Sequence, residues 1–303
     1  MVKAKAVRNK RIRSRDDIAM GIFCYSFITI IAITMLYPVL NVMAVAVSSY
    51  TSYARTPWMI IPYEFDFSAF KTVFASKLIM NSYANTIIIT LTGTVLTIAI
   101  TVLTAYPLSR PGFKGKAFFS EMIIFTMMFS GGIIPNFLLI KYIGLYNTLT
   151  ALILPGILSA FNVMLMVNFF KALPDSLIEA AKVDGASEPY VLWRIVVPLS
   201  KPVLATIALF AAVGYWNSYF SAVMYIRDQS KWPVQLVLRE IVMAANTAML
   251  NSAGNMAELD LGSIPMDSLR YASLIVVMLP IMCVYPFLQR YFTKGVMLGA
   301  VKG

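Results

Sequence analysis

Residues 179–198 read EAAKVDGASEPYVLWRIVVP and form a mostly polar segment between two long apolar stretches. Just before it, Pro174 suits the first turn of a helix. The apolar side chains that share one face at helical spacing are Leu177, Ile178 and Ala181. Gly185 can adopt the left-handed conformation that ends a helix. We therefore expect a short amphipathic helix that stops at Gly185.

A second helical piece is expected directly after this turn. Ser187 is a suitable N-cap, and Glu188 favours the positive end of a helix. Pro198 then closes the segment before the next apolar stretch. The segment is thus predicted to be a helix, a turn and a second helix outside the lipid.

The rest of the chain is strongly apolar. Of its 303 residues 59% are hydrophobic and 13% are charged, against roughly 25% charged in soluble domains. The apolar residues come in six blocks, each long enough for the ~20 residues that cross a bilayer. These blocks are 18–48, 80–107, 118–140, 147–170, 202–226 and 271–289, and Glu121 is the one charged residue in them. The alternating segments of a closed barrel are absent, so we predict an all-α, polytopic membrane protein with six transmembrane helices.

The positions of Lys and Arg predict the orientation. They collect in the N-terminal tail and in alternate loops, and cytoplasmic loops retain such residues. Both termini are therefore expected in the cytoplasm. The predicted parts are a basic cytoplasmic tail at 1–17, a six-helix transmembrane domain at 18–289 with a cytoplasmic loop at 171–201 and an external loop at 227–270, and a C-terminal cytoplasmic tail at 290–303.

Several functions are disfavoured by composition. The net charge of +11 comes from basic residues that flank the spans, so we expect no nucleic-acid partner. The chain has no His, and Cys24 and Cys283 both lie in apolar blocks, which leaves no ligand set for zinc or haem. We find no phosphate loop, dinucleotide fingerprint or nucleophile elbow. If the protein uses ATP, another chain must bind it.

The pattern Glu179-Ala180-Ala181, Gly185 four positions later, and then Ile195 and Pro198 resembles the EAA loop of ABC importer permeases. The family usually has Leu before the final Pro, where this chain has Val197. The resemblance implies a type I importer architecture in which this loop docks into a separate ATPase subunit. The residues it assigns to ATPase coupling are Glu179, Ala180, Ala181, Asp184, Gly185, Ile195 and Pro198.

The residue types suit such docking on physical grounds as well. Small Ala180 and Ala181 allow another surface to approach the helix backbone, and Glu179 supplies an anionic anchor. The alternative is an interfacial helix that lies on lipid headgroups. Glu179, Asp184 and Glu188 are poor partners for anionic lipid, which disfavours it.

Residues 289–303, QRYFTKGVMLGAVKG, resemble the C-terminal signature of the carbohydrate-importing branch. In that branch a glycine-rich tail follows the last span and reaches into the ATPase pair. The resemblance assigns ATPase contacts to Gly295, Gly299, Lys302 and Gly303. An ordinary disordered terminus is the alternative.

Residues 214–220, GYWNSYF, lie within the fifth block. An unpaired Asn is costly in lipid, so Asn217 should face the interior of the bundle. Trp216, Tyr219 and Phe220 offer flat faces of the kind that stack on sugar rings, which predicts a substrate path. The alternative is that these side chains join two helices.

Two further stretches leave choices open. In the third block Gly131, Gly132 and Pro135 predict an interrupted helix, which would be either a moving gate or a packing kink. In the external loop, the stretch WPVQLVLREIVMAA is apolar enough to pack on the membrane-facing body or on a partner, and in the family such a loop reaches the sugar-binding protein.

Taken with the resemblance, these features predict a non-enzymatic, multi-pass permease subunit of a carbohydrate importer, in particular for oligosaccharides, in the bacterial cytoplasmic (inner) membrane. The implied partners are a second homologous permease, two ATPase subunits that bind ATP and Mg, an extracellular or periplasmic solute-binding protein, the carbohydrate and membrane lipid. This chain should bind no cofactor. The alternatives are an ABC importer of amino acids or anions, an ion-coupled transporter, for which Glu121 is the lone acid, and a glycan-processing enzyme, which would need paired acids.

Overall fold

The computed structural model describes residues 15–250 and 266–300. These residues form helices and one isolated β-bridge, between Ser48 and Phe65. The chain divides into two compact units, residues 1–67 and 68–303. The predicted all-α fold is confirmed for the part of the chain that the structure describes.

The first unit contains one long helix, α1 (Arg15–Ala46), and a short one, α2 (Tyr50–Arg55). The loop after α2 is tied to α1 by Asn41, whose Nδ2 donates to the carbonyls of Pro57 and Met59 at 2.9 and 2.8 Å. The predicted first span therefore forms an uninterrupted helix.

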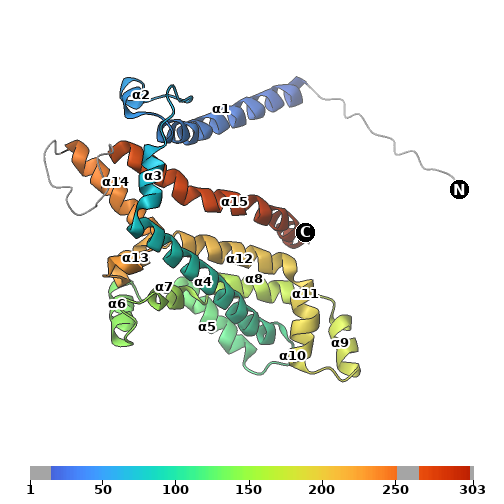
Figure 1. The fold of residues 1–303 in the computed structure, drawn as a ribbon. Helices are drawn as coiled ribbons and strands as arrows, with labels where there is room; N and C mark the ends of the chain where they lie inside the picture. Colours follow the sequence, from blue (N-terminus) through green and yellow to red (C-terminus); the bar gives the residue numbers. More distant parts are fainter. Residues whose placement is uncertain (1–14, 251–265, 301–303) are drawn as a thin grey trace. The chain divides into compact units, whose positions relative to one another are not determined.

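The second unit holds the remaining helices (Figure 1). They are α3 (Ser68–Ala75), α4 (Lys77–Ser109), α5 (Lys116–Met128), α6 (Ile133–Tyr142), α7 (Thr150–Ile153), α8 (Ala160–Lys171), α9 (Asp175–Val183), α10 (Glu188–Val191), α11 (Val197–Leu199), α12 (Lys201–Trp216), α13 (Tyr219–Tyr225), α14 (Val234–Leu250) and α15 (Met266–Ala300). Short 3₁₀ turns occur at Leu154–Gly156 and Gln229–Lys231, and Leu192–Val196 is a π-helix.

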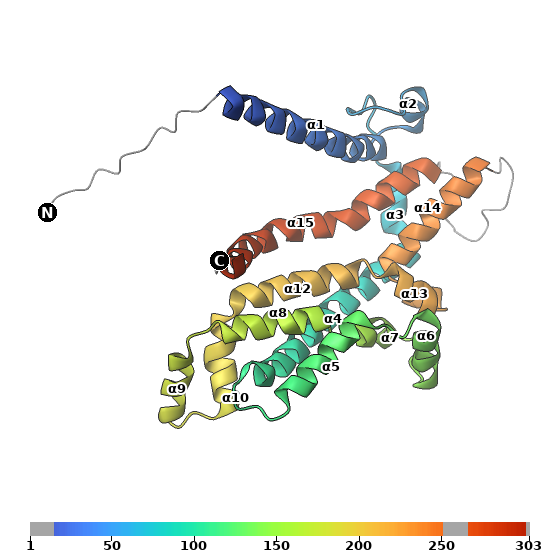
Figure 2. The ribbon, with the colours of Figure 1, turned by 180° about the vertical axis from the view of Figure 1, so that it is seen from behind.

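A bundle of α4, α8 and α12 forms the centre of this unit (Figures 1 and 2). Its core contains Val102 of α4, Met166 of α8 and Ile207 of α12, each at most 1% exposed. Helix α15 packs against α12, α14 and α3. The bundle is the frame on which the candidate sites are built.

Within the described residues, three helical stretches are each long and apolar enough to cross a membrane, namely Ile18–Ala46, Lys77–Ser109 and Asp267–Val284. Three bent helix pairs raise the number to as many as six if each pair is one span. The length and composition of the described helices are therefore compatible with the six predicted spans, and the number depends on how the bent pairs are counted.

The third predicted span is broken where the sequence indicated. Helices α5 and α6 meet at an angle of 115°. Gly132 has a φ of 84°, in the left-handed region, and Pro135 follows in the first turn of α6. Glycine reaches this φ without steric cost, which permits the sharp change of direction.

The fifth predicted span differs from a single helix over 202–226. Helix α12 ends at Trp216 and α13 begins at Tyr219. At its other end, α12 meets the preceding helical stretch at 81° around Ser200. Pro198 and Pro202 lack an N–H, so helical hydrogen bonds are missing on both sides of this bend.

The predicted external loop at 227–270 contains helix α14. Its residues Val234, Leu236, Val237 and Ile241 are buried, and the helix packs against α4 and α15. The backbone N–H of Val234 donates to Thr86 Oγ1 of α4 at 2.8 Å. The sequence analysis left two possibilities for this stretch, packing on the membrane-facing body of the chain or on a partner. The structure shows packing on the chain's own helices.

Helix α15 continues past residue 289, the predicted end of the last span. Of the predicted glycine-rich tail, the residues up to Ala300 are helical. Gly295 and Gly299 cost about 1 kcal/mol each relative to Ala in a helix, and the residues between them include good helix formers such as Met and Leu. Lys302 and Gly303 lie outside the described residues.

Candidate functional site

The EAA segment, residues 174–200, has the predicted helix–turn–helix form. Helix α9 follows Pro174 and ends at Val183, and Gly185 has a φ of 79°. The turn is closed by hydrogen bonds from Gly185 N to Lys182 O at 3.0 Å and from Ala186 N to Ala181 O at 2.9 Å. The prediction that Gly185 ends the first helix in the left-handed conformation is confirmed.

One face of α9 packs on the bundle and the other is exposed. Ile178 is buried in the core that contains α4, α8 and α12, and Ala181 packs beside it. Leu177, which was predicted on the same apolar side, is instead 45% exposed because it points away from this core. The amphipathic helix is thus confirmed with a narrower apolar face.

The residues assigned to ATPase coupling lie mainly on the exposed surface of this segment. Glu179, Ala180, Asp184, Gly185 and Pro198 are exposed, while Ala181 and Ile195 are half-buried. Next to them Val183 is 87% exposed. The sequence analysis did not select Val183. Its position directly after Ala180-Ala181-Lys182 could have placed it on the solvent-facing side of the predicted helix.

Helix α10 begins as predicted, with Ser187 at the N-cap position and Glu188 in the first turn. The Ser187 side chain makes no capping hydrogen bond. Hydrogen bonds from Lys182 and from Tyr106 hold the pKa of the Glu188 carboxyl below its usual range. The group is therefore ionised near neutral pH and accepts charge-assisted hydrogen bonds.

The four residues predicted for the substrate path do not share one surface. Trp216 is 8% exposed and packs edge-on to Tyr83, with ring centroids 6.2 Å apart. Asn217 is exposed, and its Oδ1 accepts a hydrogen bond from Gln235 Nε2 at 3.2 Å. Tyr219 and Phe220 are 44% and 50% exposed and form an edge-to-face pair. Trp216 thus joins helices, and the other three remain accessible.

A cavity of about 520 Å³ lies beside these residues and was not predicted from the sequence. It opens among α4, α7, α8, α12 and α13. Its lining combines small polar groups with three aromatic rings, namely Ser159, Phe161, Asn162, Phe210, Tyr215, Ser218 and Ser221. The rings of Phe161 and Phe210 lie 6.2 Å apart across α8 and α12. We call this space the central cavity.

Tyr215 forms the inner wall of the central cavity. Its hydroxyl donates to the carbonyl of Ile153 at 3.2 Å and lies 3.1 Å from Thr97 Oγ1. The Ile153 carbonyl lies where α7 gives way to a 3₁₀ turn, and a carbonyl at membrane depth needs such a donor. Tyr215 thus fastens a broken helix to α4 and α12 at the edge of the cavity.

Comparison with known proteins gives a consistent result. A family described as "Binding-protein-dependent transport system inner membrane component" matches residues 97–298. Protein LplC of Bacillus subtilis (strain 168) is 42% identical over 272 residues, which cover 90% of each chain. The polygalacturonan/rhamnogalacturonan transport system permease protein YtcP of the same strain is 38% identical over 280 residues, 92% of this chain and 96% of that one.

A solved structure is similar over nearly the same length. It is the crystal structure of a bacterial ABC transporter involved in the import of the acidic polysaccharide alginate. One of its chains superimposes with a TM-score of 0.83 and 34% identity, and the match covers 92% of this chain and 98% of that one.

Proposed function

The chain belongs to the family of inner-membrane components of binding-protein-dependent transport systems, and from this premise we propose that it is the permease subunit of an ATP-driven importer of an oligosaccharide. The observation that carries the proposal is the likeness along 92% of the chain to a subunit of an alginate importer. A relative with a similar coverage is named as a permease for polygalacturonan and rhamnogalacturonan. Both relatives handle chains of sugar units.

The central cavity has the chemistry that a saccharide needs. The hydroxyls of Ser159, Ser218 and Ser221 and the amide of Asn162 can exchange hydrogen bonds with sugar hydroxyls. The rings of Phe161 and Phe210 offer apolar faces for the C–H face of a pyranose. The exposed residues Asn217, Tyr219 and Phe220 extend this surface as the remainder of a substrate path.

Energy for transport comes from two partner ATPase subunits, which bind the ATP and Mg. The EAA segment presents Glu179, Ala180, Val183 and Asp184 on an exposed surface where a partner can dock. When the ATPase pair closes, the segment is pushed, and the permease changes between inward-facing and outward-facing states.

The remaining parts of the assembly follow from the family. A second permease completes the translocation path, and an external solute-binding protein delivers the sugar on the face opposite the ATPases. Both termini face the cytoplasm in this arrangement, as the distribution of Lys and Arg predicts. Gly295, Gly299, Lys302 and Gly303 would then lie on the side of the ATPases, where they contribute contacts.

Uptake into proteoliposomes tests the function. The full complex is reconstituted with external binding protein and internal ATP, and the probes are a tritiated galacturonate disaccharide and a tritiated neutral disaccharide. We expect uptake of at least one saccharide that requires ATP and survives proton and sodium ionophores. Uptake by this chain without ATPase subunits would contradict the proposal, as would ATP-driven uptake of an amino acid or phosphate with neither saccharide transported.

A further inference from the structure

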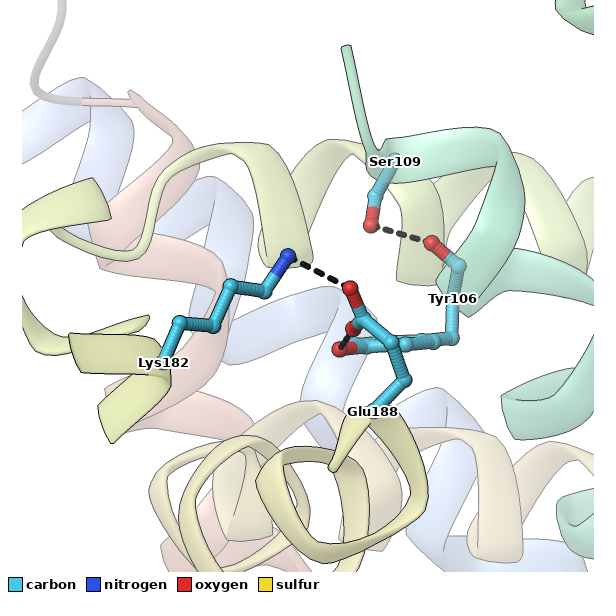
Figure 3. Close-up of polar contacts among 4 residues, drawn as sticks. All are labelled: Tyr106, Ser109, Lys182 and Glu188. Atoms are coloured by element: carbon cyan, nitrogen blue, oxygen red, sulfur yellow. Dashed lines mark hydrogen bonds and ion pairs between the residues drawn. The ribbon is translucent and has the colours of Figure 1, made fainter. Parts of the chain in front are cut away.

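A single carboxylate in the EAA segment contacts two other helices (Figure 3). Glu188, the first residue of α10, lies 2.5 Å from Lys182 Nζ of α9 through its Oε1. Its Oε2 accepts a hydrogen bond from the hydroxyl of Tyr106, in the last turn of α4, at 2.5 Å. The carboxylate therefore connects α9, α10 and α4.

The tyrosine that holds this carboxylate is firmly fixed. Tyr106 is 8% exposed, and its ring packs edge-on against Phe170 of α8 with centroids 6.4 Å apart. The guanidinium of Arg110 lies 4.8 Å from the ring centroid. The carbonyl of Tyr106 accepts a hydrogen bond from Ser109 Oγ at 2.6 Å, as Figure 3 shows. Its hydroxyl meets Glu188.

The two contacts of Glu188 differ in how firmly they fix the position of the EAA segment. The ion pair with Lys182 is about half exposed on both sides, and pairs of this kind contribute little alone. The bond from Tyr106 comes from a buried donor to an ionised acceptor, so its geometry is well defined. It fixes the start of α10 relative to the end of α4.

Helix α4 leads from this contact to the central cavity. It is continuous from Lys77 to Ser109, and Thr97 on the same helix lines the cavity and meets the hydroxyl of Tyr215. At 1.5 Å per residue, the distance along the helix from Tyr106 to Thr97 is roughly 14 Å. A displacement of the end of α4 is therefore transmitted to the cavity wall through one rigid helix.

We propose that Glu188 is a positioning residue that fastens the EAA segment to the end of α4 through Tyr106, with Lys182 holding α9 to the same carboxylate. A push on α9 by the ATPase subunits then moves α4, and with it the wall of the central cavity. The inference rests on the proposed function and adds the route by which the motion reaches the substrate. The apolar packing of Ile178 and Val191 holds the segment in place, and Glu188 sets its orientation.

The test compares Tyr106→Phe and Glu188→Ala with the unaltered chain in the reconstituted full complex. Tyr106→Phe keeps the ring and its packing and removes only the hydroxyl. We expect the number of sugars taken up per ATP hydrolysed to fall by about two- to thirtyfold, with the saccharide KM and the amount of assembled complex unchanged. The double variant should be no worse than the more affected single variant, because both remove the same bond.

Tyr63→Phe is the matched control, since Tyr63 is 72% exposed and lies in the other unit. Rates are expressed per assembled complex, so any loss of assembly is measured separately. An unchanged ratio of sugar to ATP in both single variants, or fully additive losses in the double variant, would overturn the inference. The proposed function is tested separately, by whether the unaltered complex takes up saccharide when ATP is supplied.

Discussion

At the residue scale, the contact between Gly93 and Tyr215 requires a glycine at position 93. A Cβ placed on Gly93 would lie 2.6 Å from the ring of Tyr215, closer than packed atoms can be. The ring is 6% exposed and is held at its hydroxyl, so it has little room to move. Glycine is what allows α4 and α12 to approach each other at this level.

Gly93→Ala should therefore destabilise the assembled protein by about 1–3 kcal/mol, the usual effect of overpacking a core. Thermal unfolding of the purified complex measures it. Gly21→Ala is the control, because Gly21 also lies in a helix and nothing is within 4 Å of its added Cβ. That change should be neutral or slightly stabilising, as expected from helix propensity. Equal unfolding temperatures for the two variants would show that the ring moves aside easily.

The same scale shows where sequence reasoning ends. The role of Gly185 was predictable, because a glycine after an amphipathic helix is a local signal. The bond between Tyr106 and Glu188 was not, because the two residues are 82 positions apart and nothing local pairs them. The sequence analysis placed Glu188 at a helix end and counted it among the poor partners for anionic lipid, and it placed Tyr106 in an apolar block.

At the scale of elements, the corner between α9 and α10 depends on one backbone conformation. The φ of 79° at Gly185 is available to glycine, is tolerated by Asn and is costly for other residues. Nothing lies within 4 Å of a Cβ added there, so the cost of a substitution is conformational and not steric crowding. The direction in which α9 is presented follows from this residue.

Gly185→Ala should cost about 1–2 kcal/mol at the corner and lower the uptake of sugar per ATP, while Gly185→Asn should retain most of it. The measurement is coupled uptake and ATP hydrolysis in proteoliposomes. The Asn variant is the matched control, since it adds a larger side chain than Ala but accepts the left-handed conformation. Identical losses in the two variants would mean that side-chain size, and not backbone conformation, matters here.

The breaks in the helices were predictable to different degrees. Gly132 and Pro135 predicted the break between α5 and α6, because both residues change the conformation of the backbone locally. The angle of 115° depends on what the two helices pack against, which no local pattern contains. The end of α12 at Trp216 carries neither Gly nor Pro at the break, so hydropathy alone placed a continuous span there.

At the scale of the whole molecule, the sequence pattern was enough for the fold class. A spanning segment must be a helix or part of a closed barrel, and the alternating segments of a barrel are absent. The central cavity was less accessible to prediction. Its walls come from α4, α7, α8, α12 and α13, and residues such as Ser159 and Phe210 become neighbours only when the bundle packs. Tyr219 and Phe220 were selected because their rings suit sugar, and Asn217 because an unpaired Asn is costly in lipid. Their contact with sugar stays a prediction.

The central claim is that separate ATPase subunits move this permease through the exposed face of its EAA segment. Docking there is tested by a photoreactive maleimide at Val183→Cys, after Cys24 and Cys283 have been replaced by Ala in the reconstituted complex. Tyr142→Cys in α6 is the control, since Tyr142 is 90% exposed and Val183 is 87% exposed. We expect an adduct with the ATPase subunit from position 183 and none from position 142. Adducts of equal yield from both positions, or an ATPase adduct from position 142 alone, would contradict the account.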